Sequence, residues 1–411
     1  MDNADSQVLM ARQPIFDRSQ KVVAYELLYR TEDAQGHALF NSSDSGASDA
    51  TGEVILNAYT SISDSGELKR VPAFINLTRD ILVNRSLPEV SKKHIVLEIL
   101  EDVTPDAEVI EAVRQLHAEG YRIALDDFIF SPEHIPLLEL AHIVKVDVFE
   151  LTPEQVREQV QHLKKYKVTL LAEKIETHTQ LEECIDLGFK LFQGHFLSKP
   201  KVVKGKKIQG SQVALMQLIQ ALQGNDTTPE RLEELIIRDP ALTYKLLRIV
   251  NSAGYHLVRQ VESIAEAIVL LGLEQVRKWA TLIAMSSNDN KPEELSRGLL
   301  IRGRMCEEIA QAEKLGNHGS YFMAGMMSGL HALLDIERET MLQEVPLGDD
   351  IKNAVSLGQG DIGQVLRNVV NYENGDWDLL PMDLDGPLYD RAYRASLEWT
   401  QESMQSMYET D

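Results

Sequence analysis

Short apolar segments rich in β-branched and aromatic residues alternate with amphipathic segments from residue 9 to about residue 200. This alternation is typical of parallel β/α units. The apolar segments predict strands over residues 10–16, 22–29, 72–77, 95–100, 122–126, 143–146, 168–172 and 190–192. Apolar residues at three- and four-residue spacing predict helices over residues 47–62, 105–119, 153–165 and 179–187.

The first two predicted strands differ from the others in their connection. Only a polar segment at residues 17–21 separates them, which is too short for a helical crossover. We therefore expect one antiparallel strand at the start of an otherwise parallel sheet. The number of strands with helical crossovers favours a modified TIM-like barrel of the α/β class over an open sheet.

Beyond residue 210 the periodic segments are helical. Apolar faces predict helices over residues 211–222, 229–237, 241–252, 264–271, 273–285, 299–313 and 387–408. The basic, glycine-containing segment 201–210 is the expected linker. The chain is therefore expected to form an α/β domain over residues 1–200 and an all-α domain over residues 211–411.

Composition narrows the classes of function. The 411 residues suffice for two or three domains. The 64 acidic and 41 basic residues give a formal net charge of −23, which argues against nonspecific binding to a nucleic-acid polymer or an anionic membrane. We find neither a signal-peptide pattern nor an apolar run that could span a bilayer, so a cytoplasmic location is expected. Cys184 and Cys306 have no metal-ligand spacing and are expected to be free buried thiols.

Polar residues stand near the ends of seven expected strands. They are acids, amides and one lysine: Glu26, Asn76, Glu98, Asp126 with Asp127, Lys145, Glu173 and Gln193. In TIM-like folds, catalytic residues lie at the carboxyl ends of the barrel strands. A single acid there is commonly a helix cap or a solvated turn residue, and Glu26 alone also suits the solvent side of an ordinary strand. Seven such positions in succession favour a site.

This set of oxygen ligands favours a hard divalent cation such as Mg²⁺ or Mn²⁺ over zinc. Asp126 and Asp127 are adjacent and could each reach a different ion, and a two-metal site is the usual solution for phosphodiester hydrolysis. Lys145 and Arg30, which shares a strand face with Glu26, would offer positive charge to a phosphate. For Asp126 and Asp127 taken alone, the competing interpretation as a helix-capping pair is favoured.

The motifs around these residues resemble those of the EAL domain family, which hydrolyses the bacterial second messenger cyclic di-GMP. The resemblance extends from about residue 9 to residue 200, in the family's motif order. The motifs are YELLYR at residues 25–30, FINLT at 74–78, LEILE at 97–101, DDF at 126–128, KVD at 145–147, AEKIET at 172–177 and QGHFLSKP at 193–200. The implied reaction is metal-dependent hydrolysis of cyclic di-GMP to linear pGpG.

The resemblance implies a role for each position. The implied ligands of Mg²⁺ or Mn²⁺ are Glu26, Asn76, Glu98, Asp126 and Asp127. Glu173 would be the general base for the attacking water, with Lys145 and Gln193 holding the water and metal cluster. Arg30 would contact a substrate phosphate, and Gln193 is also expected to bind the substrate. The positions that support the site and its loop are Glu101, Glu176 and Asp147.

Three departures from the family pattern bear on turnover more than on the fold. Active members follow the Asp-Asp-Phe motif with a Gly-rich loop that couples substrate binding to metal binding, whereas this chain has IFSPEH at residues 129–134. Glycine allows positive φ and close backbone approach, which Ile129 and Pro132 do not. Lys174 replaces a glycine beside the expected base. Residues 145–173 form a shorter segment than is usual in the family, and the helix that this shortens is one that members often use to dimerise. A homodimer is left open as an assembly of this chain.

Two segments of the second half resemble the signature of HDOD domains, an all-α family related to HD-type phosphohydrolases without their His-Asp metal dyad. They are IIRDPALTYKLLRIVNSA at residues 236–253 and SIAEAIVLLGL at residues 263–273. His331, near the position of the missing dyad, is expected to be a packed core histidine rather than a ligand. We therefore expect no catalysis from this domain, which would regulate the barrel or bind an unidentified protein partner.

Other polar residues of the helical half have two interpretations each. Asn251 and Ser252 either cap and link helices or belong to a partner surface, and the structural role is favoured. Lys245, Arg248 and Arg277 could form a small basic face, although charge on an amphipathic helix is usually only solvated.

The sequence leaves two main functions open. The first is a bacterial cyclic di-GMP phosphodiesterase, which the retention of so many desolvated acids favours. The second is a catalytically inactive EAL–HDOD receptor or scaffold that acts through protein–protein interaction, which residues 129–134 and Lys174 favour. Hydrolysis of a different phosphodiester by the same metals is a third, weaker alternative.

Overall fold

The computed structural model describes residues 7–32, 71–85, 87, 91–199, 219, 228–237, 240–251, 261, 263–286, 291–344 and 347–408. The chain divides into two compact units, one of residues 1–199 with 371–390 and one of residues 200–370 with 391–411. The helix expected over residues 47–62 and the linker expected over 201–210 lie outside the described residues, as does the helix expected over 211–222 apart from residue 219.

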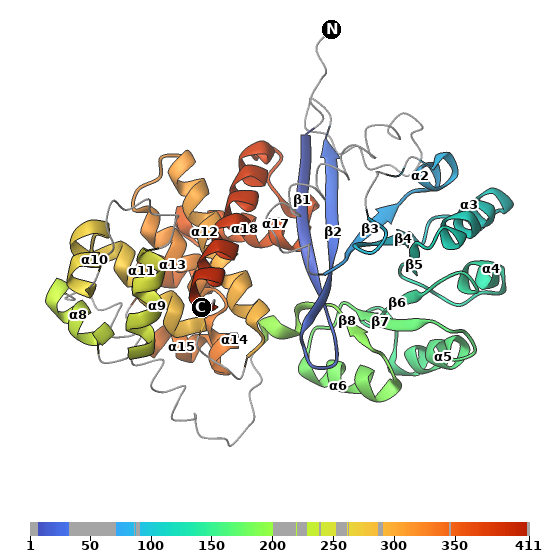
Figure 1. Ribbon diagram of the computed structural model, residues 1–411, viewed down its shortest axis with the longest axis horizontal. Helices are drawn as coiled ribbons and strands as arrows, with labels where there is room; N and C mark the ends of the chain where they lie inside the picture. The colour runs from blue at the N-terminus through green and yellow to red at the C-terminus, as the bar shows by residue number, and fades with distance from the viewer. Residues whose placement is uncertain are drawn as a thin grey trace, which may run out of the picture. The chain divides into compact units, whose positions relative to one another are not determined.

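Eight strands close into a barrel in the first unit, in the order of the sequence (Figure 1). They are β1 (Gln7–Phe16), β2 (Val22–Glu32), β3 (Ala73–Leu77), β4 (Ile95–Ile99), β5 (Arg122–Leu125), β6 (Ile143–Asp147), β7 (Thr169–Glu173) and β8 (Leu191–Phe192). β1 pairs antiparallel with β2 and with β8, and the other neighbours pair in parallel. The predicted TIM-like barrel with one antiparallel strand is confirmed.

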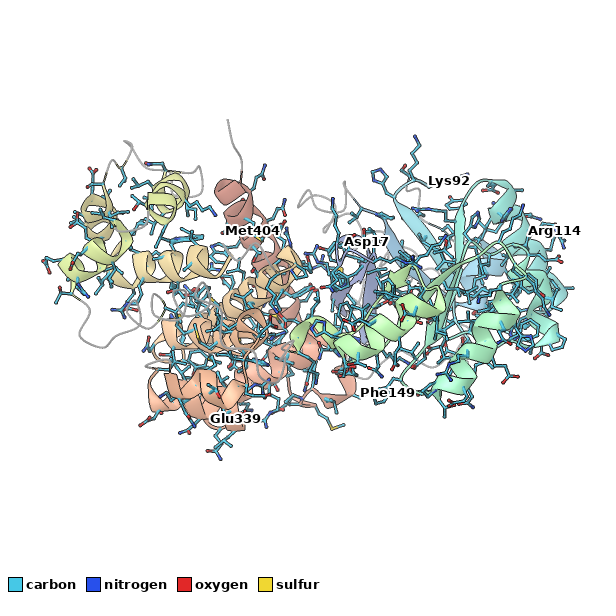
Figure 2. All side chains as sticks on the ribbon, turned by 90° about the horizontal axis from the view of Figure 1, so that it is seen from below. Asp17, Lys92, Arg114, Phe149, Glu339 and Met404 are labelled. Atoms are coloured by element: carbon cyan, nitrogen blue, oxygen red, sulfur yellow. The ribbon has the colours of Figure 1, made fainter. Side chains whose placement is uncertain are left out.

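The helices of this unit follow the strands and lie outside the barrel (Figure 1). They are α2 (Arg79–Asn84), α3 (Ala107–Ala118), α4 (Ile135–Leu138), α5 (Pro153–Leu163) and α6 (His178–Leu187). Thr152 and Thr177 start α5 and α6 with capping boxes. The outer face of α3 is charged: Arg114 forms an ion pair with Glu111 and projects from the surface of the unit (Figure 2).

The barrel interior is filled by an apolar layer with one residue from each of seven strands. The layer consists of Ile15, Ala24, Phe74, Val96, Ala124, Ile143 and Leu171, and Leu191 of β8 packs against it. Side chains two positions apart on a strand point to the same face. The residues two positions from this layer therefore also face the interior.

The described part of the second unit is helical, as predicted. Its helices are α8 (Pro229–Ile237), α9 (Pro240–Val250), α10 (Ile264–Leu271), α11 (Leu273–Ser286), α12 (Glu293–Ala312), α13 (His318–Met327), α14 (Leu330–Leu334), α15 (Arg338–Glu344) and α16 (Asp349–Leu357), with most of α17 (Gly360–Asn374) and α18 (Gly386–Tyr408). α12 and α13 approach closely because Gly325 has no side chain. A Cβ at this position would overlap the backbone of Gly303. Cys184 and Cys306 are free and buried, as expected. No helix in the described part of the chain has both the length and the apolar character needed to cross a bilayer.

Candidate functional site

A polar layer adjoins the apolar layer on the side of the carboxyl ends of the parallel strands. Two residues after each apolar-layer residue of β2 to β8 stands a polar one: Glu26, Asn76, Glu98, Asp126, Lys145, Glu173 and Gln193. β1 runs in the opposite direction, so its residue at this level lies two positions before Ile15, at Gln13, which is paired with Glu26 in the strand register. Each of the eight strands thus contributes one polar residue at this level.

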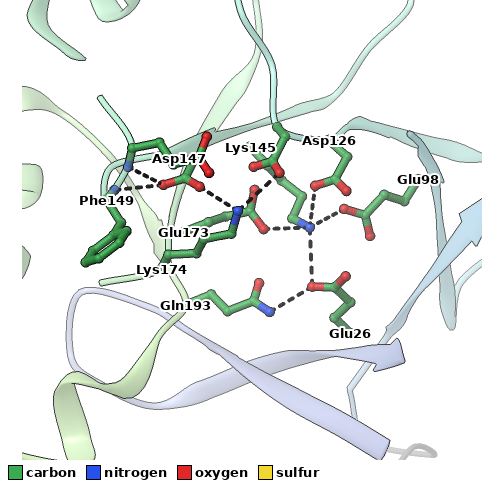
Figure 3. Close-up of polar contacts among 11 residues, drawn as sticks. Glu26, Glu98, Asp126, Lys145, Asp147, Phe149, Glu173, Lys174 and Gln193 are labelled. Carbon is green, nitrogen blue, oxygen red and sulfur yellow. Dashed lines mark hydrogen bonds and ion pairs between the residues drawn. The ribbon is translucent and has the colours of Figure 1, made fainter. Parts of the chain in front are cut away.

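The ammonium group of Lys145 lies at the centre of this layer (Figure 3). Its Nζ contacts Asp126 Oδ1 at 2.8 Å, Glu173 Oε1 at 2.7 Å and Glu26 Oε2 at 3.3 Å, and it also pairs with Glu98. The side chain of Lys145 is 1% exposed and that of Glu98 is fully buried. The structure thus brings together four of the acids and the lysine that the sequence singled out.

Burial dominates the electrostatics of these groups. It raises the pKa of Glu98 and of Glu173 well above the ordinary carboxyl value, although the Lys145 ammonium opposes this effect. Burial lowers the pKa of Lys145, but the attraction of Glu173 and the other acids outweighs it, so the pKa lies well above that of an ordinary lysine. Burial alone would raise the pKa of Asp126, yet its contact with Lys145 holds the pKa below the usual value. Lys145 is therefore a fixed positive charge, and burial favours the protonated form of Glu98 and of Glu173.

Several buried oxygens of the layer have no hydrogen-bond partner among the described residues. They are Asn76 Oδ1, Glu98 Oε2, Asp127 Oδ1, Glu173 Oε2 and Gln193 Oε1. Leaving a buried polar oxygen unpaired is costly, so such oxygens need a partner. Carboxylate and amide oxygens are the ligands that hard divalent cations prefer, and the residues present therefore fit Mg²⁺ or Mn²⁺.

A second group of charges lies beside the layer, at the ends of β5, β6 and β7. Lys174 Nζ donates to Asp147 Oδ2 at 2.5 Å and to Asp127 Oδ2 at 3.2 Å. Asp147 Oδ1 accepts hydrogen bonds from the backbone N–H groups of Phe149 and Glu150. Burial raises the pKa of Asp127, with the neighbouring Asp126 adding to the effect.

Asp126, Asp127 and Glu173 can each offer a carboxylate oxygen within 4.8 Å of the others. Among the described residues this is the one group of three or more metal-ligating side chains at that spacing. Neither aspartate caps a helix, because the next helical turn begins only at η1 (Pro132–His134). The capping interpretation is therefore wrong. The solvent-side interpretation of Glu26 is also wrong, since this residue is 6% exposed.

A hydrogen-bonded chain connects Glu26 to the periphery of the unit. Gln193 Nε2 donates to Glu26 Oε2 at 2.7 Å and to Gln13 Oε1 at 2.9 Å. Gln13 Nε2 in turn donates to the carbonyl oxygen of Asn374 at 2.9 Å. The sequence did not single out Gln13, although its place two residues before an inward apolar residue of an antiparallel strand is a signal that could have identified it.

Supporting contacts surround the layer. Glu176 Oε1 lies 3.3 Å from His195 Nδ1, whose Nε2 lies 3.2 Å from Asn374 Oδ1. Tyr29 donates a 2.7 Å hydrogen bond to the carbonyl oxygen of Asn76, and burial raises the pKa of this tyrosine. Arg30 pairs with Leu9 in the β1–β2 register, and its side chain lies outside the described part of the structure.

The segment 129–134 lies against α5. The backbone N–H of Phe130 donates to Gln159 Oε1 at 2.9 Å, and its ring stacks on His162 with centroids 4.5 Å apart. A pocket of about 220 Å³ opens beside the segment and is lined by Asp126, Asp127, Glu101 and His134, with apolar residues on its other walls. Ile129 is 61% exposed on its rim. The segment is thus anchored at its centre, next to both aspartates.

In the helical unit His331 and Asn251 have structural roles, whereas Ser252 and the side chain of Arg248 lie outside the described part of the chain. His331 is buried within α14, as predicted. Asp335 accepts a 2.5 Å hydrogen bond from Lys291, which also donates to the carbonyl oxygen of Ala332. Asn251 exchanges two hydrogen bonds with the backbone of Val261, at 2.7 and 2.9 Å, which agrees with the favoured structural role.

Comparison with known proteins gives two family matches. Residues 3–200 match the family model of the EAL domain, and residues 211–345 match that of the HDOD domain. YuxH of Bacillus subtilis, an uncharacterized protein, is 31% identical over 404 residues, which cover 95% of this chain and 98% of YuxH. A protein of Vibrio cholerae named cyclic di-GMP phosphodiesterase CdgJ is 33% identical over 372 residues, covering 90% of this chain and 85% of CdgJ.

Among solved structures, the EAL enzyme Bd1971 with bound cAMP and cyclic di-GMP matches with a TM-score of 0.40 and 19% identity. The match covers 47% of this chain and 62% of Bd1971. The chain thus spans less than two thirds of the length of that protein.

Proposed function

The chain belongs to the family of proteins that join an EAL domain to an HDOD domain. From this premise we propose that it acts in cyclic di-GMP signalling. Its barrel would hydrolyse cyclic di-GMP to linear pGpG with divalent metal ions. The name of the relative CdgJ supports the choice of substrate. The composition of the polar layer supports the choice of chemistry.

The observation that carries the proposal is an excess of negative charge at the site, most of it buried. Six carboxylates surround two ammonium groups, so four negative charges remain when every acid is ionised; the acids are Glu26, Glu98, Asp126, Asp127, Asp147 and Glu173. Burial of unpaired charge is costly. Two divalent cations would balance this charge and would also give partners to the unpaired oxygens.

The residues proposed to hold Mg²⁺ or Mn²⁺ are Glu26, Asn76, Glu98, Asp126 and Asp127. Metal ions bound there would lower the pKa of water and stabilise charge on the phosphate oxygens. In this arrangement Glu173 is the proposed base that takes the proton of the attacking water, because its Oε2 is buried and unpaired beside Asp126 and Asp127.

Lys145 and Gln193 hold the acids in place. Lys145 fixes Glu173 through Oε1 and leaves Oε2 for the proton. Gln193 fixes the orientation of Glu26 through its 2.7 Å hydrogen bond. Arg30 is proposed to bind a substrate phosphate, and Glu101, Glu176 and Asp147 to support the site.

A non-hydrolysing receptor is the second candidate function. Two observations favour it, namely the absence of glycine from residues 129–134, which α5 anchors, and the ammonium of Lys174 bound to Asp127. In both versions the HDOD domain is proposed to be a non-catalytic module that regulates the barrel or binds a protein partner.

The test is the incubation of purified full-length protein with cyclic di-GMP and Mn²⁺, followed by chromatography of the nucleotides. The wild type is expected to form pGpG, and Glu26→Ala to lower the rate at least about 100-fold because Glu26 is a proposed ligand. Glu183→Ala, an exposed glutamate on α6, is the matched control and should retain the wild-type rate.

Absence of pGpG from the wild type, with Glu26→Ala indistinguishable from it, would contradict the enzyme. Calorimetry then separates the remaining functions. Binding of cyclic di-GMP without turnover supports the receptor, and absence of binding leaves only a protein scaffold.

A further inference from the structure

Lys174 is a second ammonium group at the site, and the proposed hydrolysis gives it no task. Its side chain is 49% exposed, in contrast to the buried Lys145. Figure 3 shows its amine bound to Asp147, which is not one of the four acids that contact Lys145. The two bonds of Lys174 join carboxylates from the ends of two strands, Asp127 after β5 and Asp147 in β6.

The backbone at Lys174 adopts a conformation that suits glycine better than lysine. Its φ of +55° is left-handed, which is uncommon for a residue with a long side chain. Asp127, at the other end of the ion pair, also has a positive φ, of +37°. Backbone preference therefore does not explain a lysine here, whereas its two carboxylate partners do.

The carboxylates that bind Lys174 overlap with the group that could hold a metal ion. Asp127 belongs to the close group with Asp126 and Glu173, and it is also a partner of Lys174. Its Oδ2 accepts from the ammonium, while its Oδ1 is buried without a hydrogen-bond partner. A divalent ion at this position would lie close to the ammonium and share a carboxylate with it, so the two cations repel each other.

The remaining partner of Lys174 is fixed independently of any metal. Asp147 Oδ1 accepts hydrogen bonds of 2.7 and 3.0 Å from the backbone of Phe149 and Glu150, which leaves Oδ2 for the ammonium. Because Lys174 is half exposed and has a long side chain, it can release Asp127 and keep Asp147. Exposed ion pairs are weak enough for such a release.

We propose that Lys174 is an internal cation that weakens the binding of a second divalent ion: it neutralises Asp127 in the metal-free protein and releases it when the ion binds. This inference rests on the proposed metal site. Among the described residues, Lys174 bonds to Asp127 and Asp147, not to the carboxylate oxygens of Glu26 and Glu98 that would bind the other ion. The two ions therefore bind with unequal affinities, and the fully loaded site forms only at the higher metal concentrations.

The first test is calorimetric titration of metal-free, full-length protein with Mn²⁺ in the absence of nucleotide. The wild type should show two sites of unequal affinity. Lys174→Gln, which keeps much of the side-chain length and the left-handed backbone but removes the charge, should tighten the weaker site about ten-fold or more and leave the tighter site within about two-fold.

Two further variants control for charge and for location. Lys174→Arg retains the positive charge and should resemble the wild type. Lys190→Gln removes an exposed lysine at the start of β8 and should also resemble the wild type. Tightening of the weaker site in either variant would contradict the inference.

The second test measures the amine directly. Acetylation of Lys174 with acetic anhydride, followed by mass spectrometry, should accelerate several-fold when Mn²⁺ is added, while that of Lys190 should not change. A Lys174→Gln protein that binds both ions no more tightly than the wild type, or an acetylation rate insensitive to Mn²⁺, would overturn the inference. The proposed function would still stand in that case, whereas absence of Mn²⁺ binding in the wild type and in every variant would overturn both.

Discussion

At the scale of single residues, the barrel places one polar side chain per strand at one level. Lys145 contacts four acids at that level, and its pKa lies well above the ordinary lysine value. Because this pKa is higher in the folded protein than in the unfolded chain, the charged lysine contributes its full stability below the ordinary lysine pKa and loses it only as the pH rises through the folded-state value.

Replacement of this lysine should be severely destabilising. In metal-free protein, Lys145→Met leaves the buried acids without their partner, and we expect a loss of about 3–5 kcal/mol in the free energy of unfolding near pH 7. The loss should be smaller at pH 5 than at pH 8, because burial raises the pKa values of Glu98 and Glu173 and these acids become neutral first as the pH is lowered. Urea denaturation at each pH measures the effect.

The matched variant is Lys190→Met, which removes an exposed lysine from the same barrel. It should change the unfolding free energy by less than about 0.5 kcal/mol at either pH. Equal losses in the two variants, or a loss in Lys145→Met that does not depend on pH, would contradict the electrostatic account.

The residues of the polar layer could be predicted to different extents. Seven of the eight follow short apolar strands and lie in recognisable motifs, so the sequence singled them out. Gln13 escaped because β1 is antiparallel and the relevant position precedes the inward apolar residue rather than following it. The ion pairs of Lys174 could not be foreseen, since a positive φ and a long side chain decide where its amine lies.

At the scale of secondary structure, the strands could be predicted nearly to the residue because their apolar runs are short and bounded by polar turns. α2 and α4 were missed because six and four residues are too few to show a helical period, and the helices from α13 to α17 were not predicted individually. The contact between the ends of β7 and β8 was also not evident. There the backbone of Ile175 bonds to Gln193 and Phe196, and a Cβ at Gly194 would overlap the backbone N and O of Ile175.

Gly194 is therefore a position where even alanine should not fit. We expect Gly194→Ala to cost more than about 3 kcal/mol of unfolding free energy, since it combines a strained φ of +141° with a backbone overlap. Gly188→Ala is the control: it has a φ of +108° but nothing within 4 Å of the added Cβ, so only the strain of about 1–2 kcal/mol should appear. Urea denaturation compares the two variants, and equal costs would show that the overlap is relieved without consequence.

At the scale of the whole molecule, each compact unit is formed by two separate stretches of the chain. Residues 371–390 belong to the barrel unit, although 171 residues of the helical unit precede them, from 200 to 370. Tyr372 accepts a 3.2 Å hydrogen bond from the backbone of Met10, and the carbonyl of Asn374 accepts from Gln13. A pattern of periodic segments carries no information on such distant contacts. The sequence therefore predicted the barrel and the helical class of the second unit, but not these contacts of residues 371–390 with the barrel.

The barrel therefore receives support for its site from both ends of the chain. Gln13, Gln193 and Asn374 form one hydrogen-bonded chain that ends at Glu26, the first acid of the polar layer. Whether this layer binds two divalent metal ions therefore bears directly on whether the protein is an enzyme or a scaffold.

The most direct test of the central claim is anomalous diffraction at the manganese edge from crystals of the full-length protein grown with saturating Mn²⁺. Two peaks should appear in the polar layer, one beside Glu26, Glu98 and Asp126 and one beside Asp126, Asp127 and Glu173. A map without a peak in this layer, with Lys145 still bound to its four acids, would contradict the claim that these residues form a two-metal site.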